Sequence, residues 1–287
     1  LNKNLKFFLN NNPFNYCVID NFFERKIAKK LEKEFPHYES NIWQGYNNPI
    51  EVKKICNNWN LFRETTYKVV TYLNSEKFIS LLSKKISKKK IYPDVGLNGG
   101  GWHIHKKGGK LNTHLDYSIH PKLNLQRKLN LIVYLNSKWK DTWGGHLGLW
   151  GNKNSKIPGK LIKSIVPIFN RAILFDTTQN SWHGLPEPVC CPTNNARKSL
   201  AIYYLSAITQ TATARHRALF APSDEQKDSK EIEELILTSI NAEMFSKRYS
   251  KVSEGSDDWK KIKTSESSIY NWDESSTYVK KPPFFEK

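Results

Sequence analysis

The sequence predicts a mainly β fold with a helical layer, and we expect a jelly roll. From residue 99 onward, short apolar stretches alternate with clusters of Gly, Pro and Asn, which is typical of strands joined by turns. Strands of this length and number predict a sandwich, jelly roll or barrel. The segments before residue 99 are helical instead, and helices followed by strands favour a jelly roll with helices packed on one sheet. The candidate strands are residues 102–106, 110–116, 129–136, 146–150, 161–166, 171–176 and 199–206.

The chain begins with a predicted strand and helix. Residues 16–19 form a short apolar stretch, and the residues after it place apolar side chains at helical spacing. Asp20 or Asn21 is expected to cap this helix. A second helical region, 61–87, is interrupted at 74–75 and ends within the lysine-rich run KKISKKK. For that run a solvated surface is favoured over specific polyanion binding.

The last part of the chain predicts one helix and a polar tail. Residues 228–231 (DSKE) resemble a capping box, and the helix that they open is expected to end near residue 248. Its apolar side comprises Ile232, Leu235, Ile236 and Ile240. We therefore expect three segments: residues 1–98 with the N-terminal strand and helices packing on the core, 99–210 forming the jelly-roll core, and 211–287 as a C-terminal extension.

The chain is strongly basic. Its 45 Lys and Arg against 27 Asp and Glu give a formal net charge of +18, which attracts polyanions at ordinary ionic strength. Nucleic acid, an anionic glycan or an acidic protein is thus permitted as a partner. The excess is mostly lysine and accompanies abundant Asn and Ile, so AT-rich coding explains it equally well.

The cysteines and the lengths of the apolar segments indicate the cellular compartment. The four cysteines form no CxxC pair and are too few for a disulfide framework, which favours a reducing compartment. No apolar run approaches the roughly 20 residues that span a bilayer, and the first residues lack a signal peptide's apolar stretch. We expect a cytoplasmic protein that does not enter the membrane, and the sequence leaves its oligomeric state open.

A possible metal site lies in THLD, residues 113–116. Within a strand, His114 and Asp116 project from the same face and can meet one metal ion together. His183 follows the apolar strand AILFD and is the best placed third ligand. Two imidazoles and one carboxylate are the ligands of non-haem iron(II) oxygenases, whereas zinc catalysis is the competing metal chemistry.

An HxD tripeptide alone is common, but the motifs around this one are specific. They are RKLNLIVYLNSKWKDTWGGHLGLW, IFNRAILFDTTQNSWHGLPEPV and ARKSLAIYYLS. With them, the stretch from about residue 99 to 206 resembles the catalytic core of the prolyl-4-hydroxylase-like 2-oxoglutarate/iron(II) oxygenases. The resemblance implies a double-stranded β-helix, which is a cupin-like jelly roll, with iron(II) held by His114, Asp116 and His183 at one open end.

The resemblance also implies a binding site for 2-oxoglutarate. Arg197 matches the family's basic residue for the distal carboxylate, and a guanidinium suits that role. The insert EPVCCPTNNA is longer than usual, so Lys198 is the alternative; strand parity favours Arg197, whose face includes Ser199. Tyr134 matches a family tyrosine that reaches the same carboxylate, unless it is a core aromatic. Asn130 shares the face of Tyr134 and is expected to line the pocket.

The implied activity is that of a dioxygenase. We expect iron(II)- and 2-oxoglutarate-dependent hydroxylation of an unactivated C–H bond, with succinate and carbon dioxide as co-products and ascorbate as a supporting reductant. Because Asp116 is kept, hydroxylation is favoured over halogenation, in which related enzymes replace this carboxylate. A prolyl residue of a peptide or protein is the first candidate substrate. Loops 117–126 and 151–160, which contain several lysines, are expected to select it.

Two alternatives stay open. The same chemistry could act on a small polar substrate such as a sugar or nucleotide, or on a nucleic-acid base, because fold does not fix substrate. A non-catalytic jelly-roll module that binds polyanions would instead show salt-sensitive binding and no formation of succinate.

The remaining histidines and the glycine clusters receive structural interpretations. His103 and His105 share a face but lack a carboxylate partner, so we place them at the pocket mouth or on the sheet surface. We assign His216 to a surface loop without a role. His120 and His146 are weaker candidates for a functional role than His103 and His105. The glycines at 99–101 and 144–145 are expected to form turns that lead into strands.

Overall fold

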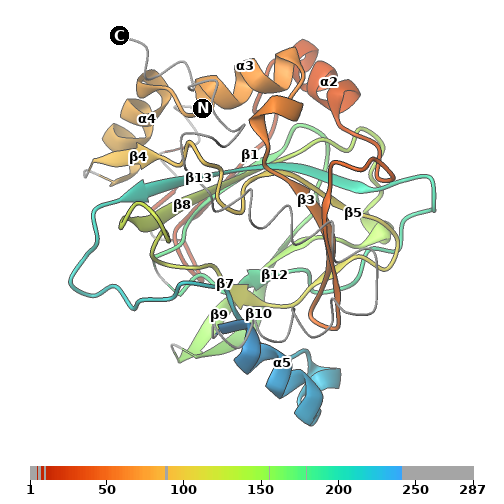
Figure 1. Ribbon diagram of the computed structural model, residues 1–287, viewed down its shortest axis with the longest axis vertical. Coiled ribbons are helices and arrows are strands. Elements are labelled where there is room, and N and C mark those ends of the chain that lie inside the picture. Colours follow the sequence, from red (N-terminus) through yellow and green to blue (C-terminus); the bar gives the residue numbers. More distant parts are fainter. Residues whose placement is uncertain are drawn as a thin grey trace.

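Two antiparallel sheets form the centre of the computed structural model, and helices α2, α3 and α4 cover the outside of the larger one (Figure 1). The structure describes residues 11–87, 90–154, 156–178 and 180–240, together with residues 5, 8 and 9. The predicted fold class, mainly β with a helical layer on a jelly roll, is confirmed.

The N-terminal part supplies most of the helices. Its elements are β1 (Tyr16–Ile19), α2 (Arg25–Glu34), β2 (Gln44–Asn48), β3 (Glu51–Cys56), the 3₁₀ turn η1 (Trp59–Leu61), α3 (Glu64–Leu73), α4 (Glu76–Leu82), the π-helical turn η2 (Ser83–Ser87) and β4 (Ile91–Pro93). The predicted interruption of the second helical region is confirmed, because α3 ends at Leu73 and Ser75 caps α4 by accepting a hydrogen bond from the amide of Phe78.

The rest of the described chain is mostly strands. These are β5 (Gly101–His105), β6 (Lys110–Leu111), β7 (His114–Leu115), β8 (Gln126–Tyr134), β9 (Leu147–Asn154), β10 (Ile157–Ile165), β11 (Ala172–Asp176), β12 (His183–Gly184), β13 (Arg197–Ser206) and β14 (Leu219–Phe220). The 3₁₀ turns η3 (Asp141–Trp143) and η4 (Asp224–Gln226) and helix α5 (Lys230–Ile240) complete them.

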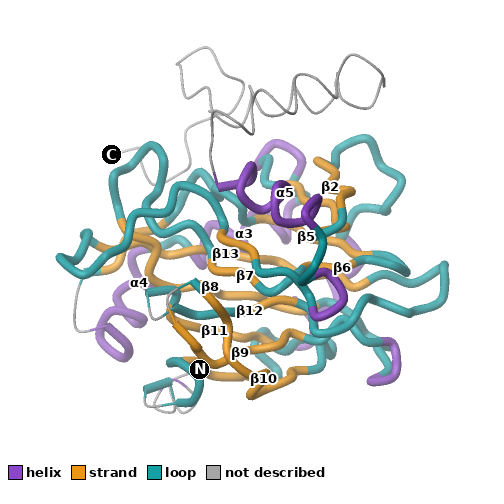
Figure 2. Tube along the Cα trace, turned by 90° about the horizontal axis from the view of Figure 1, so that it is seen from below, coloured by secondary structure: helices purple, strands orange, loops and turns teal. Residues whose placement is uncertain are grey.

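The strands pair into a major and a minor sheet. In the major sheet the order is β1-β11-β8-β13-β5-β3-β2, with β4 added beside β13 and β6 beside β3. In the minor sheet it is β10-β9-β12-β7-β14. Figure 1 shows the major sheet above the minor sheet, with α5 below the strands of the minor sheet, and Figure 2 shows the molecule from that lower side. Side chains on the inner faces of the two sheets therefore face each other across the space between the sheets.

Alternation along β8 and β13 separates the two faces of the major sheet. One face carries apolar side chains that form a single core with α2, α3 and α4, and successive residues turn to opposite sides of a strand. These core residues include Leu129, Leu131, Val133, Leu200, Ile202 and Tyr204 from the sheet and Leu31, Val70 and Phe78 from the helices. The intervening residues face the minor sheet, and this face holds the pocket described below.

Several local predictions were wrong. Helix α2 begins at Arg25 after Glu24 and has no side-chain cap, because Asn21 adopts a left-handed turn (φ 53°) and Asp20 pairs with Arg171 instead. The predicted strand 110–116 is split into β6 and β7, so Asp116 lies just beyond a strand. Residues 151–160, predicted as a substrate-selecting loop, belong to the β9–β10 hairpin.

The prediction for the last helix was partly wrong. The capping box is formed by Ser223 and Gln226 at η4, while at α5 the amide of Ile232 approaches the hydroxyl of Ser229 at 3.4 Å. The predicted end of the helix near residue 248 and the polar tail lie outside the described residues. Among the residues that the structure describes, no helix is long and apolar enough to cross a membrane.

Candidate active site

Three predicted ligands meet at one point between the sheets. Strands β7 and β12 pair with His183 directly opposite His114, and Asp116 follows β7. The Nε2 atom of each imidazole lies 3.7 Å from a carboxylate oxygen of Asp116, Oδ1 for His114 and Oδ2 for His183. One ligand atom from each residue lies within 4.8 Å of the other two. The three predicted ligands therefore lie in one compact cluster, although Asp116 is not in a strand.

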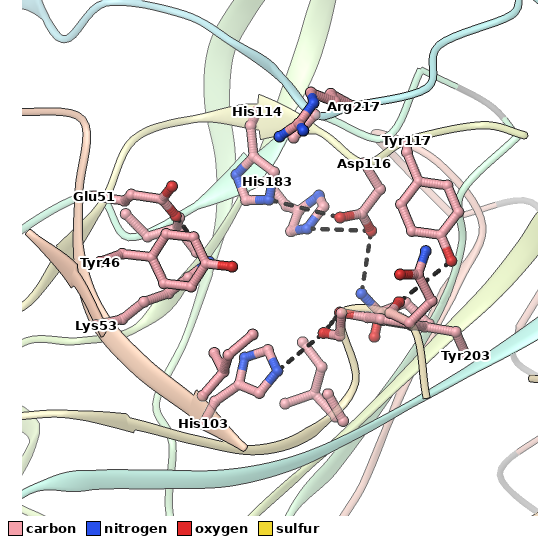
Figure 3. Close-up of a pocket in the computed structure, with 18 of the residues that line it drawn as sticks. Tyr46, Glu51, Lys53, His103, His114, Asp116, Tyr117, His183, Tyr203 and Arg217 are labelled. Carbon is pink, nitrogen blue, oxygen red and sulfur yellow. Dashed lines mark hydrogen bonds and ion pairs between the residues drawn. The ribbon is translucent and has the colours of Figure 1, made fainter. Parts of the chain in front are cut away.

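The backbone fixes the orientation of both imidazoles. His114 Nδ1 lies 2.9 Å from the carbonyl oxygen of Asn112, and His183 Nδ1 lies 2.8 Å from that of Ser181. These carbonyls can only accept, so Nδ1 carries the hydrogen and donates it. The lone pair of each Nε2 consequently points toward Asp116, as in histidines that bind metals. Figure 3 shows the three side chains converging.

The cluster is held in the protonation state that a cation requires. Burial, and then the charge of His183, lowers the pKa of His114 to about 3, and burial also lowers the pKa of His183. Burial opposes ionisation of Asp116, but the positive charge of Arg127 outweighs it and holds the pKa of this carboxyl well below its usual range. Two neutral imidazoles and one carboxylate are therefore present at neutral pH.

Asp116 has two further partners from β8. The side-chain amide of Asn130 donates to Asp116 Oδ2 at 3.2 Å, and the Nη1 of Arg127 lies 3.3 Å from Oδ1. Asn130 was predicted as a cofactor-binding residue that lines the pocket; it lines the pocket, and its amide holds Asp116. Arg127 is 3% exposed, and its guanidinium stacks between the rings of Tyr117 and Tyr203.

Sequence reasoning missed Arg127 for a geometric reason. By simple alternation Arg127 shares the apolar outer face of Leu129 and Leu131. The register with β13 shifts between Leu129 and Arg127, however, since Tyr204 pairs with Leu129 and Leu205 pairs with Arg127. This bulge turns Arg127 toward the inner face. No local signal marked Arg127, because its neighbours Gln126 and Lys128 are polar as well.

Arg197 lies deeper in the same pocket. Its Nε donates to the carbonyl oxygen of Gly145 at 2.6 Å, and its Nη2 donates to the hydroxyl of Tyr134 at 3.1 Å. Gly145 has a φ of +64°, and a Cβ there would lie 3.1 Å from Arg197 Cδ, so glycine is required beside the arginine. Ser199 lines the pocket next to Arg197. Lys198 points the other way, with its amine 5.6 Å from the ring centre of Phe35.

The pocket itself has a volume of about 420 Å³, which suits a small molecule or one end of a larger one. Its apolar lining includes Leu111, Ile132, Leu147, Leu185 and Phe220. One wall is the β2–β3 hairpin, which carries Tyr46, Glu51 and Lys53 toward the centre (Figure 3). Glu51 and Lys53 form an ion pair of 3.0 Å. The sequence did not predict this hairpin because QGYNN and EVKKIC lack a clear apolar alternation.

Three further histidines line the pocket. His103 and His105, predicted at the pocket mouth or on the sheet surface, line the pocket, and His103 contacts the carbonyl oxygen of Gly99 at 3.1 Å. His216 is exposed in a loop, as predicted, and also lines the pocket. His120 is buried beside Asp94, at 3.5 Å, and His146 lies outside the pocket near Asp141.

The donor set fits a divalent metal of the first transition row. Two Nε2 atoms and one carboxylate can occupy one face of an octahedron and leave the opposite face for other ligands. The Nδ1–carbonyl bonds and the contacts of Asn130 and Arg127 with Asp116 are the outer partners that such sites use. The cluster can therefore hold a metal that binds a second molecule in the pocket.

Comparisons with known proteins agree with this geometry. Residues 100–205 match the family model of the 2OG-Fe(II) oxygenase superfamily. A prolyl hydroxylase from Trichoplax adhaerens, solved with a peptide of the hypoxia inducible factor oxygen degradation domain, is 21% identical with a TM-score of 0.52; the match covers 71% of this chain and 89% of that chain. A prolyl-4-hydroxylase from Pseudomonas putida is 13% identical with a TM-score of 0.49, covering 68% and 93%.

A different similarity is short. Aconitate hydratase A from Rickettsia felis is 46% identical over 57 residues, or 20% of this chain, and the chain spans only 6% of the length of that protein. A stretch of this size transfers no activity. The match of residues 100–205 to the family model and the fold shared with the Trichoplax protein extend over more of this chain. Residues 100–205 are thus similar to the 2OG-Fe(II) oxygenase superfamily, and the chain has the fold of a prolyl hydroxylase.

Proposed function

We propose that the protein is an iron(II)- and 2-oxoglutarate-dependent dioxygenase that hydroxylates an unactivated C–H bond, with a prolyl residue of a peptide or protein as its substrate. The observation that carries the proposal is the convergence of His114, Asp116 and His183 with their Nε2 and carboxylate atoms within 4.8 Å. The similarity of residues 100–205 to the 2OG-Fe(II) oxygenase superfamily supports the two cofactors.

The three ligands have complementary roles. His114 and His183 offer neutral nitrogen donors whose direction is set by the backbone, and Asp116 supplies the negative charge. When bound, iron(II) and 2-oxoglutarate supply the oxidative decarboxylation that activates dioxygen and yields succinate and carbon dioxide. Because Asp116 occupies the carboxylate position, we assign hydroxylation rather than halogenation.

Arg197 and Tyr134 are the proposed anchors for the distal carboxylate of 2-oxoglutarate. Arg197 is 4% exposed, and its charge has no carboxylate partner among the ion pairs of the described residues. A dicarboxylate would supply the missing negative charge, because a buried cation is stable only with a counter-charge. Ser199 adds a hydroxyl beside Arg197. Ile132 and Leu147 would exclude water from the carbon atoms that join the two carboxylates of 2-oxoglutarate.

A peptide is the substrate class that we favour. The shared fold includes a Trichoplax prolyl hydroxylase that was solved with a peptide. The wall formed by Tyr46 of the β2–β3 hairpin gives an aromatic surface on which a pyrrolidine ring can pack. A screen that includes peptides, nucleotides and glycans tests this choice.

The test is formation of succinate by the purified full chain with iron(II), ascorbate and 2-oxoglutarate. We expect turnover of 2-oxoglutarate that proline-containing peptides stimulate, and we expect His114→Ala to abolish it. Absence of both metal binding and 2-oxoglutarate turnover would refute the enzyme assignment. Full activity in His114→Ala would refute the ligand assignment, and stimulation by nucleotides or glycans alone would refute the peptide.

A further inference from the structure

His105 is a buried side chain without a partner in the middle of the pocket wall. It is 2% exposed, and within the described part of the chain neither Nδ1 nor Nε2 has a hydrogen-bond partner. His103, His114 and His183 each have a backbone carbonyl as partner. Since buried polar groups are nearly always paired, His105 needs an explanation.

The sheet register places His105 beside the proposed carboxylate anchor. Strands β5 and β13 pair with His105 directly opposite Arg197, and both residues line the pocket. Residues directly opposite each other in an antiparallel pair send their side chains to the same face of the sheet. His105 and Arg197 therefore approach the same region from neighbouring strands.

The surroundings of His105 favour an anion. Burial, followed by the positive charges of Arg197 and Lys53, holds the pKa of His105 well below its usual value, so its imidazole is neutral. A neutral imidazole keeps one N–H donor and one acceptor nitrogen. A cationic metal is disfavoured next to Arg197, whereas a carboxylate can accept from both residues.

We propose that His105 donates a hydrogen bond to the distal carboxylate of 2-oxoglutarate, beside Arg197 and Tyr134. This inference rests on the proposed function, because it assumes that 2-oxoglutarate occupies the pocket. A purely structural role explains less: an aromatic ring without nitrogen atoms would fill the same space and leave no buried polar atom unpaired.

Calorimetric titration of two 2-oxo acids into the manganese(II)-loaded full chain tests the proposal. 2-Oxoglutarate and 2-oxopentanoate have the same chelating end, but the second carries a methyl group in place of the distal carboxylate. His105→Phe removes both ring nitrogens at similar size, and His105→Gln restores an N–H donor. His146→Phe, outside the pocket, is the matched control.

We expect His105→Phe to raise the Kd of 2-oxoglutarate about tenfold, as loss of one hydrogen bond to a charged group predicts. The Kd of 2-oxopentanoate should change less than about twofold, and His105→Gln should recover most of the affinity for 2-oxoglutarate. His146→Phe should bind both acids as the unsubstituted chain does.

Two outcomes overturn the proposal. Unchanged affinity for 2-oxoglutarate in His105→Phe would show that no bond is lost, and equal weakening of both acids would indicate a structural role only. If His105→Phe fails to fold, His105→Leu, which also removes both ring nitrogens, is compared with His105→Gln on the same two acids. If the unsubstituted metal-loaded chain binds no 2-oxoglutarate, the proposed function itself fails.

Discussion

The two faces of the major sheet are built from the same strands but have opposite composition. On the outer face, Leu200 and Ile202 of β13 join the apolar core under the helices. On the inner face, Arg197 and Ser199 of the same strand are buried and polar. The outer face contributes stability through burial of apolar area, whereas the inner face holds charged groups that stabilise the protein little on their own. The residues of β13 that stabilise the fold therefore alternate with the residues that are proposed to bind 2-oxoglutarate.

This separation makes neighbouring substitutions informative. A change at one residue of β13 should affect folding, and a change at the next should affect binding. If effects on the two faces were mixed, the division between an apolar core and a binding face would be wrong.

The largest contrast is expected between Arg197 and Lys198. Arg197→Met leaves the distal carboxylate of 2-oxoglutarate without its buried cation, so the Kd for 2-oxoglutarate should rise by about 1000-fold, or about 4 kcal/mol. Lys198→Met should change it less than about twofold, because Lys198 lies over Phe35 on the other face. Calorimetry on the manganese-loaded protein measures both. A large effect of Lys198→Met with none of Arg197→Met would reverse the assignment of the anchor.

Acid should destabilise the inner face of the metal-free protein. The pKa values of His103 and His114 are lowered to about 3, and those of His105 and His183 are also lowered, mainly by burial. Between the unfolded pKa near 6.5 and the folded values, the unfolded chain binds more protons, so stability is lost as pH falls. Asp116 adds nothing here, because its lowered pKa acts only below about 4.

Each histidine contributes up to about 1.4 kcal/mol per pH unit in this range, so the free energy of unfolding should fall by about 3 kcal/mol or more between pH 7 and pH 5. Urea unfolding at both pH values measures it. His105→Phe should lose less over the same interval because one titrating group is gone. Equal stability at the two pH values would contradict the neutral, buried state of these imidazoles.

The alternation along β13 could be predicted from the sequence, but the bulge in β8 could not. Strand parity alone placed Arg197 and Ser199 together and separated them from Lys198, and the structure has this arrangement. Parity fails at Arg127, because the register shift before Leu129 depends on pairing with β13 and leaves no local signal.

Pairing between distant strands explains the other differences. The metal-site prediction assumed a strand through residues 113–116, whereas β7 and β12 are two residues each and are defined by the pairing of His114 with His183. The hairpin β2–β3 carries Tyr46 and Lys53 into the pocket although its residues are mostly polar. Such elements form through tertiary contacts that override local propensity.

A smaller effect is expected from adjacent residues on the two faces. Leu200→Ala removes a fully buried side chain of the outer core and should lower the free energy of unfolding by about 3 kcal/mol. It should leave the Kd for metal within about twofold, because its face is remote from the ligands. Ser199→Ala should do the opposite, with stability nearly unchanged and binding of 2-oxoglutarate weakened about threefold. Urea unfolding and calorimetry on both variants would contradict the division if Leu200→Ala weakened binding more than folding.

The last contrast concerns Arg127, which reaches the inner face from a position that alternation assigns to the outer one. Arg127→Met removes the cation that lies 3.3 Å from Asp116 Oδ1, while Asn130 still donates to Oδ2. Loss of one outer partner should weaken metal binding about tenfold, as measured by titration with manganese(II). Stability of the metal-loaded chain should change little, because the metal then balances the charge of Asp116 and methionine fills similar space. Lys128→Met, on the other side of the bulge, is the control and should bind manganese(II) as the unsubstituted chain does. If Arg127→Met binds manganese(II) normally but unfolds more easily, Arg127 stabilises the fold rather than the metal site. Arg127 and the rings of Tyr117 and Tyr203 would then be counted with the stabilising residues.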